Sequence, residues 1–253
     1  RRTPMVTRND LETHLAALLQ VERFRDYGPN GLQVEGGQAV RRLASGVTAS
    51  LALIEAAAAW GADAIVVHHG LFWRGQDGRV VGWMQRRLRH LLAHDISLFA
   101  YHLPLDAHAE LGNNAQLARR LGLRADAWFG EQDLGAAGSA GALDSLVGLR
   151  AALADTLGRE PTVVAGDGRA LRRIGWCTGG AQSYFEAAIA TGVDAFVTGE
   201  ISEPQAHIAR ETGVAFLACG HHATERFGAA ALGERVAGTF GLEHRFIEIA
   251  NPA

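Results

Sequence analysis

Short apolar runs rich in β-branched residues alternate with helix-like patterns along most of the chain. In such runs, period-two or continuous apolar character favours strands, and apolar positions three and four apart favour helices. In the first half, strands are expected at residues 43–47, 64–67 and 96–101, with helices at 51–60 and 84–93. The second half shows the same order, with strands at 173–177, 195–198 and 214–219 and helices at 183–191 and 204–211.

The two halves are related by an internal repeat. Residues 55–66 match residues 186–197 at an offset of 131, with eight identities in twelve positions. A second echo has an offset of 119: His102 is followed by Asp106, and His221 is followed by Glu225, each acid four residues after its histidine. The sequence therefore predicts two homologous lobes.

Strands that alternate with helices of about ten residues imply right-handed crossovers and a mostly parallel sheet. We therefore expect an α/β fold made of two homologous α/β lobes, each with a sheet covered on both faces. The first lobe, with an N-terminal helix at residues 10–20 capped by Asn9, occupies residues 1–123. Residues 124–170, rich in Gly and Ala, are interpreted as a connector with one helix at 142–156, and residues 171–253 as the second lobe.

Composition narrows the functional classes. The 253 residues include 24 Lys and Arg against 27 Asp and Glu, for a net charge of −3, which argues against a dedicated nucleic-acid binder. The longest run without a charged residue spans 13 residues, too short to cross a bilayer. Only two cysteines are present, and no apolar stretch of the kind found in a signal peptide follows residues 1–5, so a cytoplasmic location is expected.

Histidines and acids cluster where the predicted strands end. His68 and His69 follow one strand, His102 follows the next, and His221 and His222 follow the last strand of the second lobe. Ligands of open α/β sheets bind at the carboxyl ends of strands. Imidazole with carboxylate suits Zn²⁺, Fe²⁺, Mn²⁺ or Co²⁺, so these residues predict a metal site.

Each of these histidines taken alone is as well explained by a hydrogen-bonded loop residue, and the adjacent His68 and His69 need a turn to act together. Their recurrence at equivalent places in both lobes favours the metal site. Cys219 is interpreted as a small buried residue rather than a soft ligand. The Gly179-Gly180 pair is only a weak signal for an anion-binding turn.

Four longer motifs identify a family. The segments GVTASLALIEAAAAWGADAIVVHHGLFW, HLPLDAHAELGNNAQLARRLG, DAFVTGE and GHHATER, together with DYGPNGLQVEG and the ending IEIANPA, resemble the Nif-three-like dinuclear metal centre proteins. Members of this family are often called GTP cyclohydrolase 1 type 2 homologues. The similarity covers essentially the whole chain and is greatest to the short bacterial members of the YbgI type.

The resemblance implies a site with two divalent metal ions, Zn, Fe or Mn, in each subunit of a ring-shaped homohexamer. Carried over by motif, the ligands are His68, His69, Asp106, His221 and Glu225, with Glu225 as the bridge. His102 corresponds to a neighbour of that site, either a further ligand or a proton-transfer group. The substrate-binding residues and the role of Glu200 stay open.

Two functions from different classes remain. One is a metal-dependent hydrolase acting on a nucleotide or a related phosphorylated heterocycle, in which two ions activate water. The other is a metal-binding, metal-trafficking or scaffold protein without turnover, favoured by the absence of a recognisable substrate motif beside a convincing set of metal ligands.

Overall fold

The computed structural model describes residues 5–253, and the first four residues, part of the segment tested above for a signal peptide, lie outside it. The chain divides into two compact units. Unit 1 comprises residues 1–111 and 228–250, and unit 2 comprises residues 112–227 and 251–253. The described part of the chain contains no helix long and apolar enough to cross a membrane.

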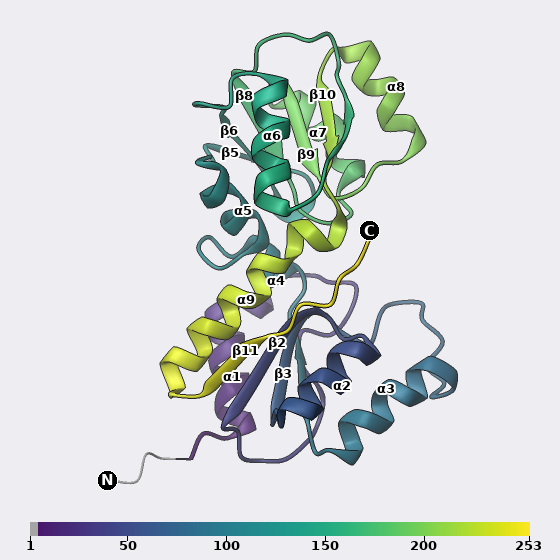
Figure 1. The fold of residues 1–253 in the computed structure, drawn as a ribbon, viewed down its shortest axis with the longest axis vertical. Helices are drawn as coiled ribbons and strands as arrows, with labels where there is room; N and C mark the ends of the chain where they lie inside the picture. Colours follow the sequence, from purple (N-terminus) through teal and green to yellow (C-terminus); the bar gives the residue numbers. More distant parts are fainter. Residues whose placement is uncertain (1–4) are drawn as a thin grey trace. The chain divides into compact units, whose positions relative to one another are not determined.

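Unit 1 is an α/β sandwich around a five-stranded sheet (Figure 1). The strand order is β1-β4-β3-β2-β11, in which only the β1–β4 pair is antiparallel. Its elements are α1 (Arg8–Leu19), β1 (Gly31–Val34), β2 (Arg42–Thr48), α2 (Leu51–Trp60), β3 (Ala64–His69), α3 (Gly82–Ala93), β4 (Ser97–Ala100), α4 (Leu103–Ala107) and β11 (Glu243–Phe246).

Alternate residues of these strands pack against helices on the two faces of the sheet. Ile65 and Val67 of β3 belong to a core with α2 and α3. Ala64 and Val66 belong to a second core with α1 and the later turns of α9 (His221–Phe240). Because both faces are covered, β3 is apolar at successive positions, which explains its continuous apolar run.

Unit 2 repeats this design around a six-stranded sheet with the order β5-β6-β8-β9-β10-β7. The central strands β8, β9 and β10 are parallel, whereas β5, β6 and β7 join antiparallel. Its elements are α5 (Asn113–Leu121), β5 (Ala127–Phe129), β6 (Gly135–Ser139), α6 (Leu146–Leu157), β7 (Thr162–Val164), β8 (Arg173–Trp176), α7 (Phe185–Ala190), β9 (Ala195–Thr198), α8 (Glu203–Thr212), β10 (Ala215–Ala218) and the first residues of α9.

The α/β class and the two related sheets are as the sequence predicts. The order β4-β3-β2 in unit 1 matches β10-β9-β8 in unit 2. The outer strand of each set has an antiparallel neighbour: β1 pairs with β4, and β7 pairs with β10. The repeat therefore begins earlier than its sequence echo, because α6 and β7 take the places of α1 and β1.

The boundaries differ from the sequence-based division. Residues expected to form a connector at 124–170 supply β5, β6, α6 and β7 of unit 2. The chain also returns to unit 1 through α9 and β11. Strand β11 pairs with β2, and residues 228–250 therefore belong to unit 1. The first helix begins at Arg8 with Thr7 as its cap, not Asn9, because the Thr7 and Asp10 side chains form a reciprocal capping box.

Gly36 and Gly37 follow β1 and provide a matched test of its docking. A Cβ on Gly36 would lie within 2.5 Å of backbone atoms of Asp95, Ile96 and Ser97, whereas one on Gly37 would meet nothing nearer than 3.5 Å. We therefore expect Gly36→Ala to lower the free energy of unfolding by about 1–3 kcal/mol, because the backbone must move apart. Gly37→Ala should stay within about 0.5 kcal/mol of the wild type in urea unfolding, and equal losses in both variants would contradict this packing.

Candidate metal centre

In unit 1, the ends of two adjacent parallel strands bring three histidines together. His68 and His69 are the last residues of β3, and His102 follows β4, its hydrogen-bonded neighbour. One ring nitrogen of each lies within 4.8 Å of the others. The ring centroids of His68 and His69 are 4.5 Å apart although both residues belong to the strand, so the turn expected between them is not needed.

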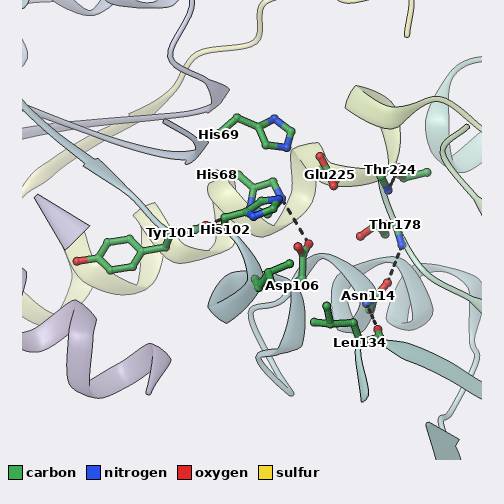
Figure 2. A network of polar contacts seen from close by, with 12 residues as sticks. His68, His69, Tyr101, His102, Asp106, Asn114, Leu134, Thr178, Thr224 and Glu225 are labelled. Carbon is green, nitrogen blue, oxygen red and sulfur yellow. Dashed lines mark hydrogen bonds and ion pairs between the residues drawn. The ribbon is translucent and has the colours of Figure 1, made fainter. Parts of the chain in front are cut away.

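Asp106 completes this set from α4. The helix begins directly after His102, and its first turn directs the Asp106 carboxylate toward His68, with Oδ1 3.4 Å from Nε2 (Figure 2). His68 is fully buried and Asp106 is 9% exposed. An imidazole and a carboxylate are thus removed from water side by side, an arrangement that suits a divalent cation.

In unit 2, His221 and Glu225 lie one helical turn apart at the start of α9, which follows β10. His221 Nε2 lies 3.1 Å from Glu225 Oε2, as expected for residues four apart on a helix. Glu225 is 3% exposed. The backbone of Gly179, with φ +74°, runs so close that a Cβ there would overlap the Glu225 carboxylate. Gly179, rather than the pair with Gly180, therefore makes room for this acid and His221.

Glu200 is the residue that the sequence left unassigned in this unit. It follows β9, and its Oε1 lies 2.5 Å from Nδ1 of His221. Burial lowers the pKa of His221, but hydrogen bonds and charge from Glu225 and Glu200 outweigh it and raise the pKa to about 9. Without a metal, His221 therefore carries a proton at neutral pH between two carboxylates.

A common feature of the four histidines is that Nδ1 is already engaged. His68 Nδ1 donates to the carbonyl oxygen of Tyr101 at 3.0 Å, and His69 Nδ1 lies 2.9 Å from the Thr48 hydroxyl. His102 Nδ1 contacts Asp26 at 2.7 Å, as His221 Nδ1 contacts Glu200. Metal-binding histidines are commonly held in this way, which orients Nε2 toward the ion.

The donor chemistry fits divalent metal ions. Each unit offers imidazole nitrogen beside a buried carboxylate, the combination that Zn²⁺, Fe²⁺ and Mn²⁺ accept. The sequence-predicted residues fall into two sets, with His68, His69, His102 and Asp106 in unit 1 and His221 and Glu225 in unit 2. Each unit therefore presents a candidate His/carboxylate metal-binding cluster.

Three further residues near these histidines have roles that the structure defines. Cys219 is buried, and burial raises the pKa of its thiol to about 12, so it is an inert core residue as expected. His222 donates its backbone N–H to the carbonyl oxygen of Ala253. Asp26, for which the sequence predicts no role, contacts His102 directly.

Comparison with known proteins gives a consistent assignment. A model of the family Duf34/NIF3 (NGG1p interacting factor 3) matches residues 6–252. The GTP cyclohydrolase 1 type 2 homolog of Pseudomonas aeruginosa is 53% identical over 241 residues, 93% of this chain and 94% of that protein. The Escherichia coli protein of the same name is 46% identical over 251 residues, 96% of this chain and 98% of its own length.

Solved structures agree with these relatives. The protein ybgI, described as of unknown function, superposes with a TM-score of 0.93 at 45% identity, covering 98% of this chain and all of that one. The protein TTHA1606 of Thermus thermophilus gives a TM-score of 0.87 at 33% identity, with the same coverage. The family resemblance inferred from the sequence motifs is confirmed: the chain belongs to the Duf34/NIF3 family.

Proposed function

We propose that the protein is a divalent-metal-dependent hydrolase that acts on a nucleotide or a related phosphorylated heterocycle. The observation that carries this proposal is the set of histidines whose Nδ1 atoms are engaged by the protein while buried carboxylates lie beside Nε2 of His68 and of His221. The names of the relatives from Pseudomonas aeruginosa and Escherichia coli point to GTP as the first substrate to test.

In this proposal, His68, His69, Asp106, His221 and Glu225 would hold two divalent ions, and the charge of Glu225 would offset both. Bound divalent ions would supply Lewis acidity and lower the pKa of water. The chain's own contribution is to fix the imidazole rings through Nδ1 and to keep Asp106 and Glu225 out of bulk solvent. His102 is the proton-transfer group, because its Nδ1 is held and Nε2 is left to take up or release a proton.

The unequal roles of the two acids give a test. Glu225→Gln keeps the volume but removes the charge that would offset two cations, so we expect both ions to be lost. Asp106→Asn should mainly weaken one ion, and circular dichroism should show that both variants stay folded, because a core of this size forms without metal. Elemental analysis after loading with Zn²⁺ or Mn²⁺ measures the stoichiometry.

The control is Glu203→Gln on α8, where Glu203 and His207 have the same four-residue spacing but are exposed. It should keep the wild-type metal content. Two ions per chain in Glu225→Gln would show that this role is assigned to the wrong residue.

Metal binding should also depend on pH through His221. Its pKa of about 9 means that an ion must displace a proton at neutral pH, so the apparent affinity should fall by up to about tenfold per unit as pH decreases from 8 to 6. Glu200→Gln removes one of the two carboxylates that raise this pKa, and should make the dependence shallower in a competition titration with a chromogenic chelator. An unchanged dependence in that variant would contradict the role of Glu200.

Turnover is tested with metal-loaded protein and a panel of GTP, other nucleotides and phosphoesters, followed by formate and phosphate release. We expect hydrolysis that is lost on chelation and reduced about 10²–10⁴-fold in His102→Gln, the range for removal of a general acid or base. Formate release from GTP would support the cyclohydrolase assignment. Two bound ions with no turnover on any substrate would exclude the hydrolase and favour the metal-binding or metal-trafficking alternative.

We further propose that the protein works in the cytoplasm as a homohexamer. Among the three apolar residues of the loop after β3, Leu71 is buried and Trp73 packs against His102, while Phe72 is 36% exposed. Four other large apolar side chains near α3 are exposed: Val80, Val81, Trp83 and Leu92.

Light scattering should give about six times the 26.9 kDa chain mass. Trp83→Glu should reduce this mass, because it places a charge in an apolar interface. Trp128→Glu, which changes an exposed tryptophan of unit 2, should leave it unchanged. A wild-type monomer at all concentrations would remove the hexamer.

A further inference from the structure

The loop before β1 holds His102 at two points. Asn30 accepts a hydrogen bond from the backbone N–H of His102 through Oδ1, at 2.8 Å. Asp26 contacts Nδ1 of the His102 ring through Oδ1, at 2.7 Å. One loop thus fixes both the backbone and the ring of His102, which lies 72 residues after Asn30 and 76 residues after Asp26.

The surroundings of the Asp26 carboxylate consist of donors. Oδ1 accepts from His102 Nδ1 and from the backbone N–H of Tyr27, and Oδ2 accepts from the backbone N–H of Leu103 and from Nδ2 of Asn30. The Asp26 side chain is 3% exposed. Burial raises its pKa, but the hydrogen bonds and charge of His102, with those of Asn30 and Leu103, lower the pKa to about 2.

An ionised carboxylate only accepts hydrogen bonds, so Nδ1 of His102 must carry a proton. A neutral His102 then has its lone pair on Nε2. This ring lies among the other histidines of the set, with centroids 5.0 Å from His68 and 5.7 Å from His69 (Figure 2). The nitrogen on which the proton sits therefore decides whether His102 can accept a proton at the candidate metal centre.

We propose that Asp26 is a positioning residue that fixes the tautomer of His102, keeping the proton on Nδ1 and the lone pair on Nε2. The tautomer is a property of the protein without substrate, and only its use in proton transfer rests on the proposed function. Asp26 also accepts the backbone N–H of Leu103, the first residue of α4, so the helix that carries Asp106 and the ring of His102 share one anchor.

The arrangement of donors makes Asp26→Asn a sharp probe. An asparagine amide has one acceptor oxygen and one NH₂ group, so its NH₂ must face either the His102 side or the side of Leu103 and Asn30. On the Oδ2 side, the Leu103 N–H cannot become an acceptor, and Asn30 already uses its Oδ1 for the His102 N–H. On the Oδ1 side, only the Tyr27 N–H is a fixed donor, because His102 can become an acceptor by moving its proton from Nδ1 to Nε2. We therefore expect the variant to place its NH₂ toward His102 and to switch the ring to the Nε2–H tautomer, as asparagine does in buried aspartate–histidine pairs.

The experiment is ¹⁵N NMR of the imidazole rings in the 253-residue protein at alkaline pH, with metal removed by a chelator. The His102 resonances are assigned from their absence in His102→Gln. The wild type should show the Nδ1–H pattern and Asp26→Asn the Nε2–H pattern. The matched control is Asp77→Asn, an exposed aspartate of the same unit that pairs with Arg79, and it should leave His102 unchanged.

An Nε2–H tautomer in the wild type would overturn the proposal without any variant, so the test survives a failure of Asp26→Asn to fold. A folded Asp26→Asn that keeps the Nδ1–H pattern would overturn it too. With turnover, Asp26→Asn should lose as much activity as His102→Gln, about 10²–10⁴-fold, and the double variant no more, because both remove the same lone pair. A tautomer switch in a protein that hydrolyses nothing would support the role of Asp26 while rejecting the hydrolase.

Discussion

The compensation of buried negative charge is the constraint on which the site depends. Asp26, Asp106 and Glu225 are almost fully removed from water, and an ionised carboxylate in such surroundings is costly unless donors or cations surround it. Asp26 is compensated by four N–H groups of its own unit. Asp106 and Glu225 instead lie beside imidazole nitrogens that are themselves metal ligands by nature. This difference separates a carboxylate that positions a neighbour from carboxylates that suit a cation.

The central strands could be predicted from the sequence because burial on both faces gives them continuous apolar runs, and because the repeat supports each assignment with a second copy. The edge strands could not. In β11, Glu243–Phe246, exposed and half-buried residues alternate without a clear apolar face. The short β7, Thr162–Val164, is likewise only partly buried. Such strands are held by pairing with a longer neighbour, β2 or β10. Their own residues do not show this pairing, so the sequence pattern does not predict them.

The same limit explains the misplaced connector. A helix was expected at 142–156 and occurs as α6, Leu146–Leu157, where Ser145 caps it. Its equivalence to α1 could not be predicted, because the two helices have no recognisable sequence similarity and only the sheet order shows that they correspond. For the site, strand-end position was sufficient to group His68, His69 and His102. The contact between Asp26 and His102 joins residues 76 apart in the chain, so no spacing rule could reveal it.

Glu200 did carry a signal, since the offset of 131 places it at the position of His69. The same offset places Gly199 at the position of His68. A Cβ on Gly199 would lie within 2.9 Å of the backbones of Gly179 and His221, so the second copy has no room for a histidine there. The close approach that excludes this side chain also brings the Gly179 turn against Glu225 and His221. The two repeats therefore have unequal donor sets for a physical reason. Unit 1 presents three imidazoles and an aspartate. In unit 2, backbone atoms occupy the position of one histidine side chain, and this backbone packs around a single histidine and its two carboxylates.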